Sequence, residues 1–207
     1  MSTDVDRRDW AVILARGDSR RMGAPKGLVV LPDDPRPLLR RVAELHDDDG
    51  RPLCIVTTPA LAAGYAGALP RRLRPVWALH PSGGDTAASV LAAVARLGAR
   101  ATHLWLHPVD VPHVAVATCR LLAETSRREP AAVVVPTHDG VRGHPVVMPC
   151  APWRGRDPAA HDGAMRDLIR AAGVPVLRLA VDDPGVARDH DEPPGTGGRG
   201  TEGGSGV

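Results

Sequence analysis

Short apolar runs alternate with amphipathic stretches along most of the chain. The runs are rich in Val, Ile and Leu, and the stretches between them carry apolar residues at helical spacing. Strands are expected at 10–14, 53–58, 75–79, 102–107, 131–135, 146–148 and 176–181, with helices at 37–46, 59–69, 86–97, 113–127 and 163–172. A short extended piece is expected at 27–31, followed by a turn at 32–35. This alternation predicts an α/β fold whose mostly parallel sheet is covered on both faces.

The polar and Gly-rich ends frame a single domain. A chain of 207 residues is typical of one domain with a full core. Residues 1–9 are polar and charged, which predicts a flexible start without an apolar leader. Residues 192–207 are rich in Gly and Pro, which predicts a flexible tail. The folded domain is therefore expected at 10–191.

Composition excludes some functional classes. The net charge is only +2 and aromatic residues are few, which argues against a nucleic-acid surface. No apolar run approaches the roughly 20 residues of a membrane span, so no membrane partner is expected. The three cysteines are odd in number and widely spaced, so they predict neither a disulfide framework nor a zinc site. A reducing cytoplasm fits this cysteine usage.

The loop at 14–26 is the first candidate for chemistry. It follows the first expected strand and carries Gly17, Ser19, Arg21 and Lys26. Small residues let a backbone approach a phosphate closely, while Arg and Lys supply charge. An ordinary basic surface loop is the alternative. The loop matches neither a Walker motif nor the dinucleotide-binding glycine pattern.

Asp110 is the second candidate. It follows the strand expected at 102–107 and lies between two prolines. A carboxylate at a strand end suits Mg²⁺, which takes one or two carboxylates together with phosphate oxygens. The alternative is an N-cap for the next helix. Because loop 14–26 and Asp110 both follow strands, they are expected to face one crevice. The flanking His107 and His113 fit packing or surface positions better than metal ligation.

Three further segments are candidates for binding. Residues 82–86 open a helix, which can bind an anion or simply be capped by its own Asp85 or Thr86. The turn at 143–145 could place His144 at a pocket rim. The acidic residues at 182–192 form a solvated charge run, or else supply a second metal ligand from Asp189 or Asp191. No serine-hydrolase elbow or Cys–His context is present.

Taken together, these motifs resemble those of the MobA-like nucleotidyltransferases. That family opens with Leu-Ala-Ala/Gly-Gly-x-Ser-x-Arg-Met-Gly-x-Pro-Lys, and residues 14–26 match nearly every fixed position. Asp110-Val111-Pro112 resembles its Asp-x-Pro segment, and Gly143-His144-Pro145 its Gly-His-Pro turn. Residues 84–90 and 189–193 resemble two further segments in the right order.

The resemblance implies a Rossmann-like three-layer αβα sandwich. It also implies Mg²⁺-dependent transfer of an NMP group from an NTP, CTP or GTP, to a phosphorylated acceptor such as molybdopterin. Pyrophosphate would leave. A molybdoenzyme or a maturation chaperone would be a possible protein partner.

The resemblance also implies roles for individual residues. Arg21, Lys26 and Asp110 would be catalytic, Asp110 and Asp191 would bind the metal, and Gly143, His144 and Pro145 would lie on the acceptor side. The nucleotide would be bound by Leu14, Ala15, Arg16, Gly17, Ser19, Arg21, Lys26 and Ser89.

Two departures from the family pattern keep other functions open. Arg16 stands where the family has Ala or Gly, and a glycine-rich tail replaces the usual terminal helix. The alternatives are a degenerate, non-catalytic nucleotide-binding protein, and a nucleotidyltransferase for a sugar phosphate or another small phosphorylated acceptor.

Overall fold

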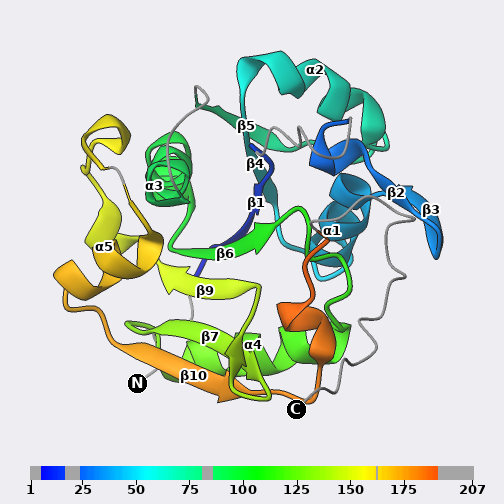
Figure 1. Ribbon diagram of the computed structural model, residues 1–207. Coiled ribbons are helices and arrows are strands. Elements are labelled where there is room, and N and C mark those ends of the chain that lie inside the picture. Colours follow the sequence, from blue (N-terminus) through cyan, green and yellow to red (C-terminus); the bar gives the residue numbers. More distant parts are fainter. Residues whose placement is uncertain (1–5, 17–23, 81–85, 162, 191–207) are drawn as a thin grey trace, which may run out of the picture.

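One mixed sheet runs through the centre of the molecule (Figure 1). The computed structural model describes residues 6–16, 24–80, 86–161 and 163–190. The sheet contains β1 (Asp9–Leu14), β4 (Leu53–Thr57), β5 (Val76–Leu79), β6 (His103–Pro108), β7 (Val133–His138), β8 (Val141–Arg142), β9 (Val146–Pro149) and β10 (Val176–Ala180). A separate two-stranded ribbon pairs β2 (Val30–Leu31) with β3 (Asp34–Pro37).

The strand order is β10-β7-β9-β6-β1-β4-β5, with β8 paired to β7. The β1–β4, β1–β6, β4–β5 and β7–β10 pairs are parallel. Strand β9 runs antiparallel between β6 and β7. The expectation of a mostly parallel sheet is therefore confirmed, with β9 reversed because it returns directly from the β7–β8 hairpin.

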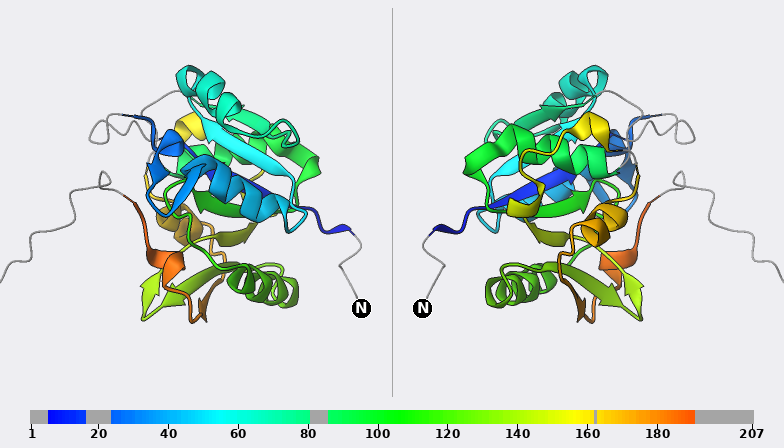
Figure 2. Two further views of the ribbon diagram at one scale, coloured as in Figure 1. Left: turned by 90° about the vertical axis from the view of Figure 1, so that its right-hand side faces the viewer. Right: turned by 90° about the vertical axis from the view of Figure 1, so that its left-hand side faces the viewer.

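Helices cover both faces of this sheet. They are α1 (Leu38–Asp47), α2 (Pro59–Ala68), α3 (Thr86–Leu97), α4 (Val116–Arg128) and α5 (Met165–Ala171). Helices α3 and α5 pack on one face, and α1 and α2 pack on the other (Figures 1 and 2). Strand residues of the α1 face, such as Trp105, also contact α4. The three-layer αβα sandwich is confirmed. Within the described ranges, none of the helices combines the length and apolarity needed to cross a bilayer.

Alternating strand residues divide the core between the two faces. In β1, Val12 packs against the α3 side, whereas Ala11 and Ile13 pack against the α1 side. In β7, Val133 packs toward α3 and Val134 toward α4. The period-2 geometry of a strand explains this division, because successive side chains point to opposite faces.

The local differences from the sequence prediction have physical reasons. The turn expected at 32–35 is shorter, because Asp34–Pro37 pairs with β2. The strand expected to end before Pro136 instead continues through it to His138. Proline lacks only its own N–H donor, so the other residues of β7 can still form their hydrogen bonds to neighbouring strands. Residues 26–28 form a 3₁₀ turn rather than an extended piece.

Two fully buried histidines join α1 to β6. His107 Nε2 lies 2.8 Å from the carbonyl oxygen of Val111, which can only accept, so this nitrogen carries the proton. Burial lowers the pKa of His107 to about 3, so the ring is neutral and its Nδ1 accepts. His46 Nε2 lies 2.8 Å from that Nδ1 and therefore donates to it. The pair fixes the segment that carries Asp110 against α1.

This pair predicts a pH-dependent stability. Burial also lowers the pKa of His46, so neither ring gains a proton in the folded protein near neutral pH. Unfolded histidine titrates near pH 6.5, so the unfolded state binds more protons below that value. The stability is fully present above about pH 6.5 and falls by about 1.4 kcal/mol per pH unit for each ring as the pH drops. The decline continues toward the folded pKa of about 3.

His46→Gln keeps a donor for His107 and removes one titrating ring. Urea unfolding at about pH 7.5, 6 and 5 is expected to show that the unfolding free energy of the variant falls less steeply with decreasing pH. The difference in slope corresponds to about one proton fewer taken up on unfolding. An unchanged pH slope would contradict the assignment.

Candidate active site

The register of two parallel strands brings the predicted site segments together. Leu14 at the end of β1 pairs with Pro108 at the end of β6. The Val109 N–H donates to the Leu14 carbonyl oxygen at 3.1 Å, which continues the pairing past both strand ends. Arg16 and Asp110 each follow two residues after this pair. The loop after β1 and the carboxylate after β6 thus leave the same edge of the sheet, as expected.

Lys26 and Asp110 form an ion pair at this edge. Lys26 Nζ lies 2.5 Å from Asp110 Oδ2, and the two side chains are 19% and 18% exposed. Lys26 is the only lysine in a chain whose other 25 basic residues are arginines. An ammonium is a compact point charge on a flexible stem, unlike the planar guanidinium fork. The site thus joins two residues that the sequence predicted as catalytic.

Asp110 is not the N-cap of the following helix. Helix α4 begins at Val116, and Asp183 caps it from a distance: Asp183 Oδ2 accepts from the Ala115 N–H at 2.9 Å and from Thr118 Oγ1 at 2.6 Å. The capping alternative for Asp110 is therefore wrong. The interpretation of the acidic residues at 182–192 as a solvated run is also wrong for Asp183, which is buried.

The chain returns to Asp110 near its C-terminal end. The His190 N–H donates to the Asp110 carbonyl oxygen at 3.0 Å. Asp191, the predicted second metal ligand, is the next residue and lies outside the described residues, as do Gly17, Ser19 and Arg21. The described residue next to it, His190, is therefore held against the backbone of Asp110.

Arg16 and Ser89, both predicted to bind nucleotide, contact each other. Arg16 Nη1 donates to the Ser89 hydroxyl, which lies on the first turn of α3. The neighbouring Ala15 is buried, and both of its backbone groups are used internally. Its N–H donates to Val56, and its carbonyl oxygen accepts from Thr57 Oγ1. The loop is thus anchored firmly before it reaches the residues expected to contact phosphate.

The turn 143–145 lies beside the same edge and is held by backbone contacts. The Gly143 N–H donates to Pro136, and the His144 N–H donates to Val186, each at 2.8 Å. A side chain at position 143 would meet the Val186 carbonyl oxygen at 2.4 Å, so only glycine fits. The turn continues through a cis peptide bond to Pro145.

The turn places the His144 side chain near Asp110. Burial lowers the pKa of His144, opposed by a hydrogen bond to Leu106 and by the nearby charge of Asp110. The ring is therefore neutral near pH 7 and close enough to Asp110 to interact with its charge. Gly143 and His144 also line the cavity described next, whereas Pro145 is buried and does not line it.

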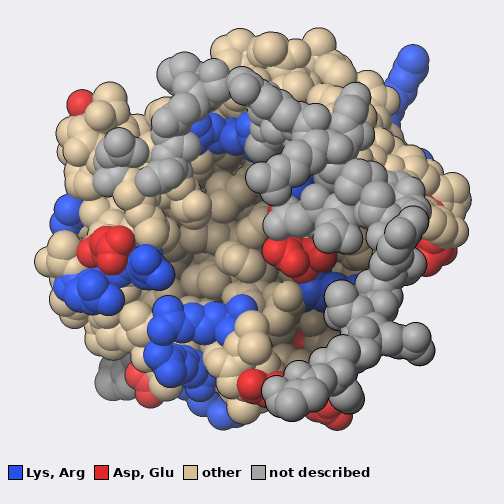
Figure 3. Space-filling model, in the orientation of Figure 1, with Lys and Arg blue, Asp and Glu red and all other residues tan. Residues whose placement is uncertain are grey.

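A cavity of about 930 Å³ opens from this edge toward α5. We call it the α5 cavity. Apolar residues form most of its wall: Leu14, Leu106, Val135, Val146, Met165, Ile169 and Val174. Four arginines also line it: Arg142, Arg166, Arg170 and Arg178. Figure 3 shows a central hollow with Lys and Arg atoms gathered to its left and below, over α5 and the strands beside it. Sequence reasoning missed these arginines, because they are scattered over three elements.

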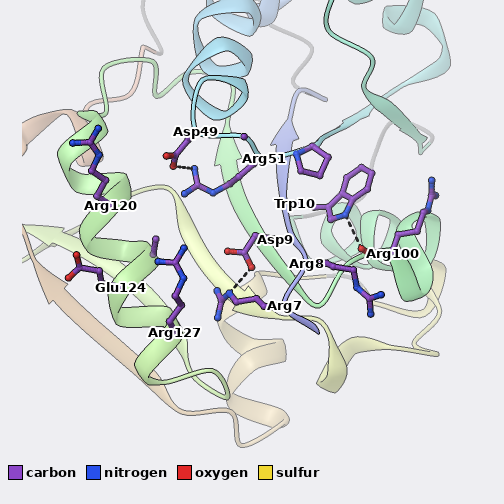
Figure 4. A pocket seen from close by; sticks show the side chains of 13 residues that line it. Arg7, Arg8, Asp9, Trp10, Asp49, Arg51, Arg100, Arg120, Glu124 and Arg127 are labelled. Carbon is purple, nitrogen blue, oxygen red and sulfur yellow. Dashed lines mark hydrogen bonds and ion pairs between the residues drawn. The ribbon is translucent and has the colours of Figure 1, made fainter. Parts of the chain in front are cut away.

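A second pocket, of about 710 Å³, lies at the amino ends of β1 and β4 (Figure 4). We call it the amino-edge pocket. Its inner arginines are used structurally. Arg7 bonds to Asp9 and Ser126, and Arg51 pairs with Asp49 and stacks on Trp105. None of the predicted site residues lines it.

The residues at the carboxyl edge fit a divalent cation only in part within the described ranges. No group of three His, Cys, Asp or Glu side chains gathers there or elsewhere in the described part of the chain. Asp110 is a partly buried carboxylate at this edge. A single carboxylate suits a hard cation that takes its remaining ligands from phosphate oxygens.

Comparisons with known proteins place this geometry in context. The model of the family described as "MobA-like NTP transferase domain" matches residues 11–186. No curated protein sequence matches the chain at a significant level.

Solved structures share the fold. The crystal structure of Rv0371c from Mycobacterium tuberculosis H37Rv is 27% identical, with a TM-score of 0.70 over 90% of this chain and 93% of that one. A structure of Rv0371C in complex with manganese, from the same organism, is 24% identical, with a TM-score of 0.63 over 84% and 88% of the two chains. Molybdopterin-guanine dinucleotide biosynthesis protein A from Archaeoglobus fulgidus is 18% identical, with a TM-score of 0.59 over 83% of each chain.

The close approach at Gly143 generates a stability prediction. Gly143→Ala forces the turn or the Val186 backbone to move, and it is expected to cost about 1–3 kcal/mol of unfolding free energy. Gly67→Ala is the matched control, because its Cβ would meet open space within α2. That control is expected to be neutral or stabilising by up to about 1 kcal/mol. Urea unfolding measures both; equal stabilities of the two variants would contradict the packing argument.

Proposed function

The chain belongs to the MobA-like NTP transferase domain family and is a nucleotidyltransferase, and we propose that it moves an NMP group from CTP or GTP to a small phosphorylated acceptor such as molybdopterin. A phosphate oxygen of the acceptor attacks the α-phosphorus of the NTP. The bond from the α-phosphorus to its bridging oxygen breaks, and pyrophosphate leaves with that oxygen. The observation that carries the proposal is the meeting of Lys26 and Asp110 at the edge where the loop after β1 begins.

The triphosphate is assigned to the loop after β1. Backbone N–H groups near Gly17 and Ser19 would donate to its oxygens, and Arg21 and Lys26 would balance its charge. Such catalysis depends on positioning and charge neutralisation rather than on a protein nucleophile. The Lys26 ammonium is paired with Asp110, which supports a role in which it exchanges this partner for phosphate oxygens.

We propose Mg²⁺ as the cofactor, with Asp110 and Asp191 as its protein ligands. A bound divalent cation would neutralise charge on the phosphates. The oxygen chemistry of Asp110 supports this assignment, and so does the backbone bond that brings position 190 beside it. The relative from M. tuberculosis solved in complex with manganese is consistent with use of a divalent cation.

The acceptor is assigned to the side of Gly143, His144 and Pro145. His144 is neutral near pH 7, so its ring can accept or donate a hydrogen bond without adding charge to the site. The α5 cavity continues from this turn, which supports binding of the acceptor there.

We further propose that residues 10–191 act as one transferase domain in the cytoplasm. The three cysteines are buried and unpaired, and burial raises the pKa of the Cys54, Cys119 and Cys150 thiols to about 12, 11 and 12. Unreactive thiols suit a reducing compartment. A molybdoenzyme or maturation chaperone could receive the product.

Asp110→Asn tests the reaction. With CTP or GTP, Mg²⁺ and molybdopterin, the wild-type protein is expected to release pyrophosphate, and the variant to lose at least about a hundredfold in kcat/KM. The matched control is Asp182→Asn, an exposed carboxylate on the C-terminal segment, which is expected to keep wild-type turnover. Wild-type activity in Asp110→Asn would contradict the proposal. Nucleotide binding without turnover would support the non-catalytic alternative, and a screen of sugar phosphates tests the other acceptor class.

Arg16→Ala tests the departure from the family pattern. We expect the Arg16 guanidinium to leave Ser89 and contact the nucleotide, so its removal is expected to weaken NTP binding by about tenfold or more. Calorimetry with CTP and GTP separates an effect on affinity from an effect on base preference. Arg16→Lys retains the charge and is expected to lose less. Unchanged binding constants for both nucleotides would reject a role for Arg16.

A further inference from the structure

We propose that Arg142, Arg166, Arg170 and Arg178, together called the arginine rim, select an acceptor that carries a second anionic group besides its reacting phosphate. The inference rests on the proposed function, because it takes the α5 cavity as the acceptor site. It goes further by naming the chemistry of the acceptor: a small molecule with a phosphate at one end and a second phosphate or a carboxylate at the other.

The α5 cavity reaches from the sheet edge that carries Asp110, here called the reaction edge, to the arginine rim. At one end it is lined by Leu14, Leu106 and His144, which belong to the edge that carries Asp110. At the other end it is lined by α5 and β10. A volume of about 930 Å³ suits a small molecule. A ligand whose phosphate lies at the reaction edge therefore extends toward the arginines.

Strand register turns two of the arginines into this cavity. Arg178 on β10 pairs directly with Val135 on β7, and Arg142 on β8 pairs directly with Thr137. Direct cross-strand neighbours project from the same face, and residues two apart on a strand do so as well. Because Val135 lines the cavity, Arg142 and Arg178 share its face.

The other two arginines lie one helical turn apart on α5. Arg166 and Arg170 are at i and i+4, so they project from one side of the helix. Both contact the Asp167 carboxylate, at 3.8 and 3.6 Å, while remaining 72% and 81% exposed. Exposed ion pairs of this length contribute little stability, so the two guanidinium groups can readily turn to a ligand.

The charge around the cavity is unbalanced. Four guanidinium groups line it, while Asp167, beside two of them, does not, and no other carboxylate does so among the described residues. Like charges gathered around an apolar wall repel each other, and a bound anion removes that repulsion. Guanidinium groups bind phosphate and carboxylate through paired hydrogen bonds, so the arginine rim matches either anion.

These arginines are not needed for the nucleotide. The triphosphate is assigned to Lys26 and to the loop that follows β1, and in the sheet β6 and β9 separate β1 from β7 and β10. The order of the strands thus separates one set of cations for the NTP from a second set for the acceptor. The apolar wall between Leu106 and Ile169 suits an uncharged body between the two anionic ends of the acceptor.

Matched pairs of small molecules test the proposal on the full chain. The probes are 2-phosphoglycerate against glycerol 2-phosphate, and fructose 1,6-bisphosphate against fructose 6-phosphate. Calorimetry is done with Mg²⁺, with and without CTP. We expect at least one probe with two anionic groups to bind about tenfold or more tightly than its match with one anionic group. The first pair reports a carboxylate and the second a phosphate as the second anion.

Two double variants locate the preference. Arg166→Ala with Arg170→Ala, and Arg142→Ala with Arg178→Ala, are expected to reduce the ratio of affinities toward one. Arg120→Ala with Arg127→Ala removes two exposed arginines from the amino-edge pocket (Figure 4) and is expected to keep the ratio. Circular dichroism and CTP binding show whether each variant is folded.

Three results would overturn the proposal. They are equal binding of both members in each pair, absence of binding by both probes that carry two anionic groups, and an equal loss of preference in the amino-edge control. Failure of the proposed function is seen separately, as absent binding of CTP and GTP or absent pyrophosphate release. The binding comparison does not depend on turnover, so the two failures are distinguishable.

Discussion

The parallel pairing of β1 with β6 is the constraint on which the site depends. The ladder joins Leu14 to Pro108, and the Val109–Leu14 hydrogen bond extends it to the point where both chains leave the sheet. Backbone bonds of this kind fix the register to one residue, and a slip would turn every side chain to the opposite face. Lys26 and Asp110 can therefore meet although they are 84 residues apart.

Contacts from distant segments then hold the edge in position. Neutral His46 and His107 tie the segment before Asp110 to α1, and the backbone of His190 holds Asp110 from the C-terminal side. Asp183 begins α4 by capping it from across the fold. Each contact joins elements that are far apart in sequence, so the position of Asp110 is a property of the whole domain.

Charge is distributed differently on the two sides of this edge. On one side a single lysine stands beside the carboxylate, where a compact, movable cation can exchange partners. On the other side four arginines surround an apolar wall. One reaction with two anionic substrates needs two separated cationic regions, since a continuous basic surface would not orient either substrate. The division matches the proposed transfer between an NTP and a phosphorylated acceptor.

The sequence by itself determined the α/β fold class, because apolar periodicity and strand-end residues report local geometry. It also singled out Lys26, Asp110 and Gly143, whose expected roles came from the resemblance of their motifs to those of a known family. Only the tertiary structure decided that Asp110 pairs with Lys26 rather than capping α4, since the actual cap, Asp183, is 65 residues from Thr118. The same holds for the four arginines of the α5 cavity: their common direction follows from strand register and helix packing, which no local pattern encodes.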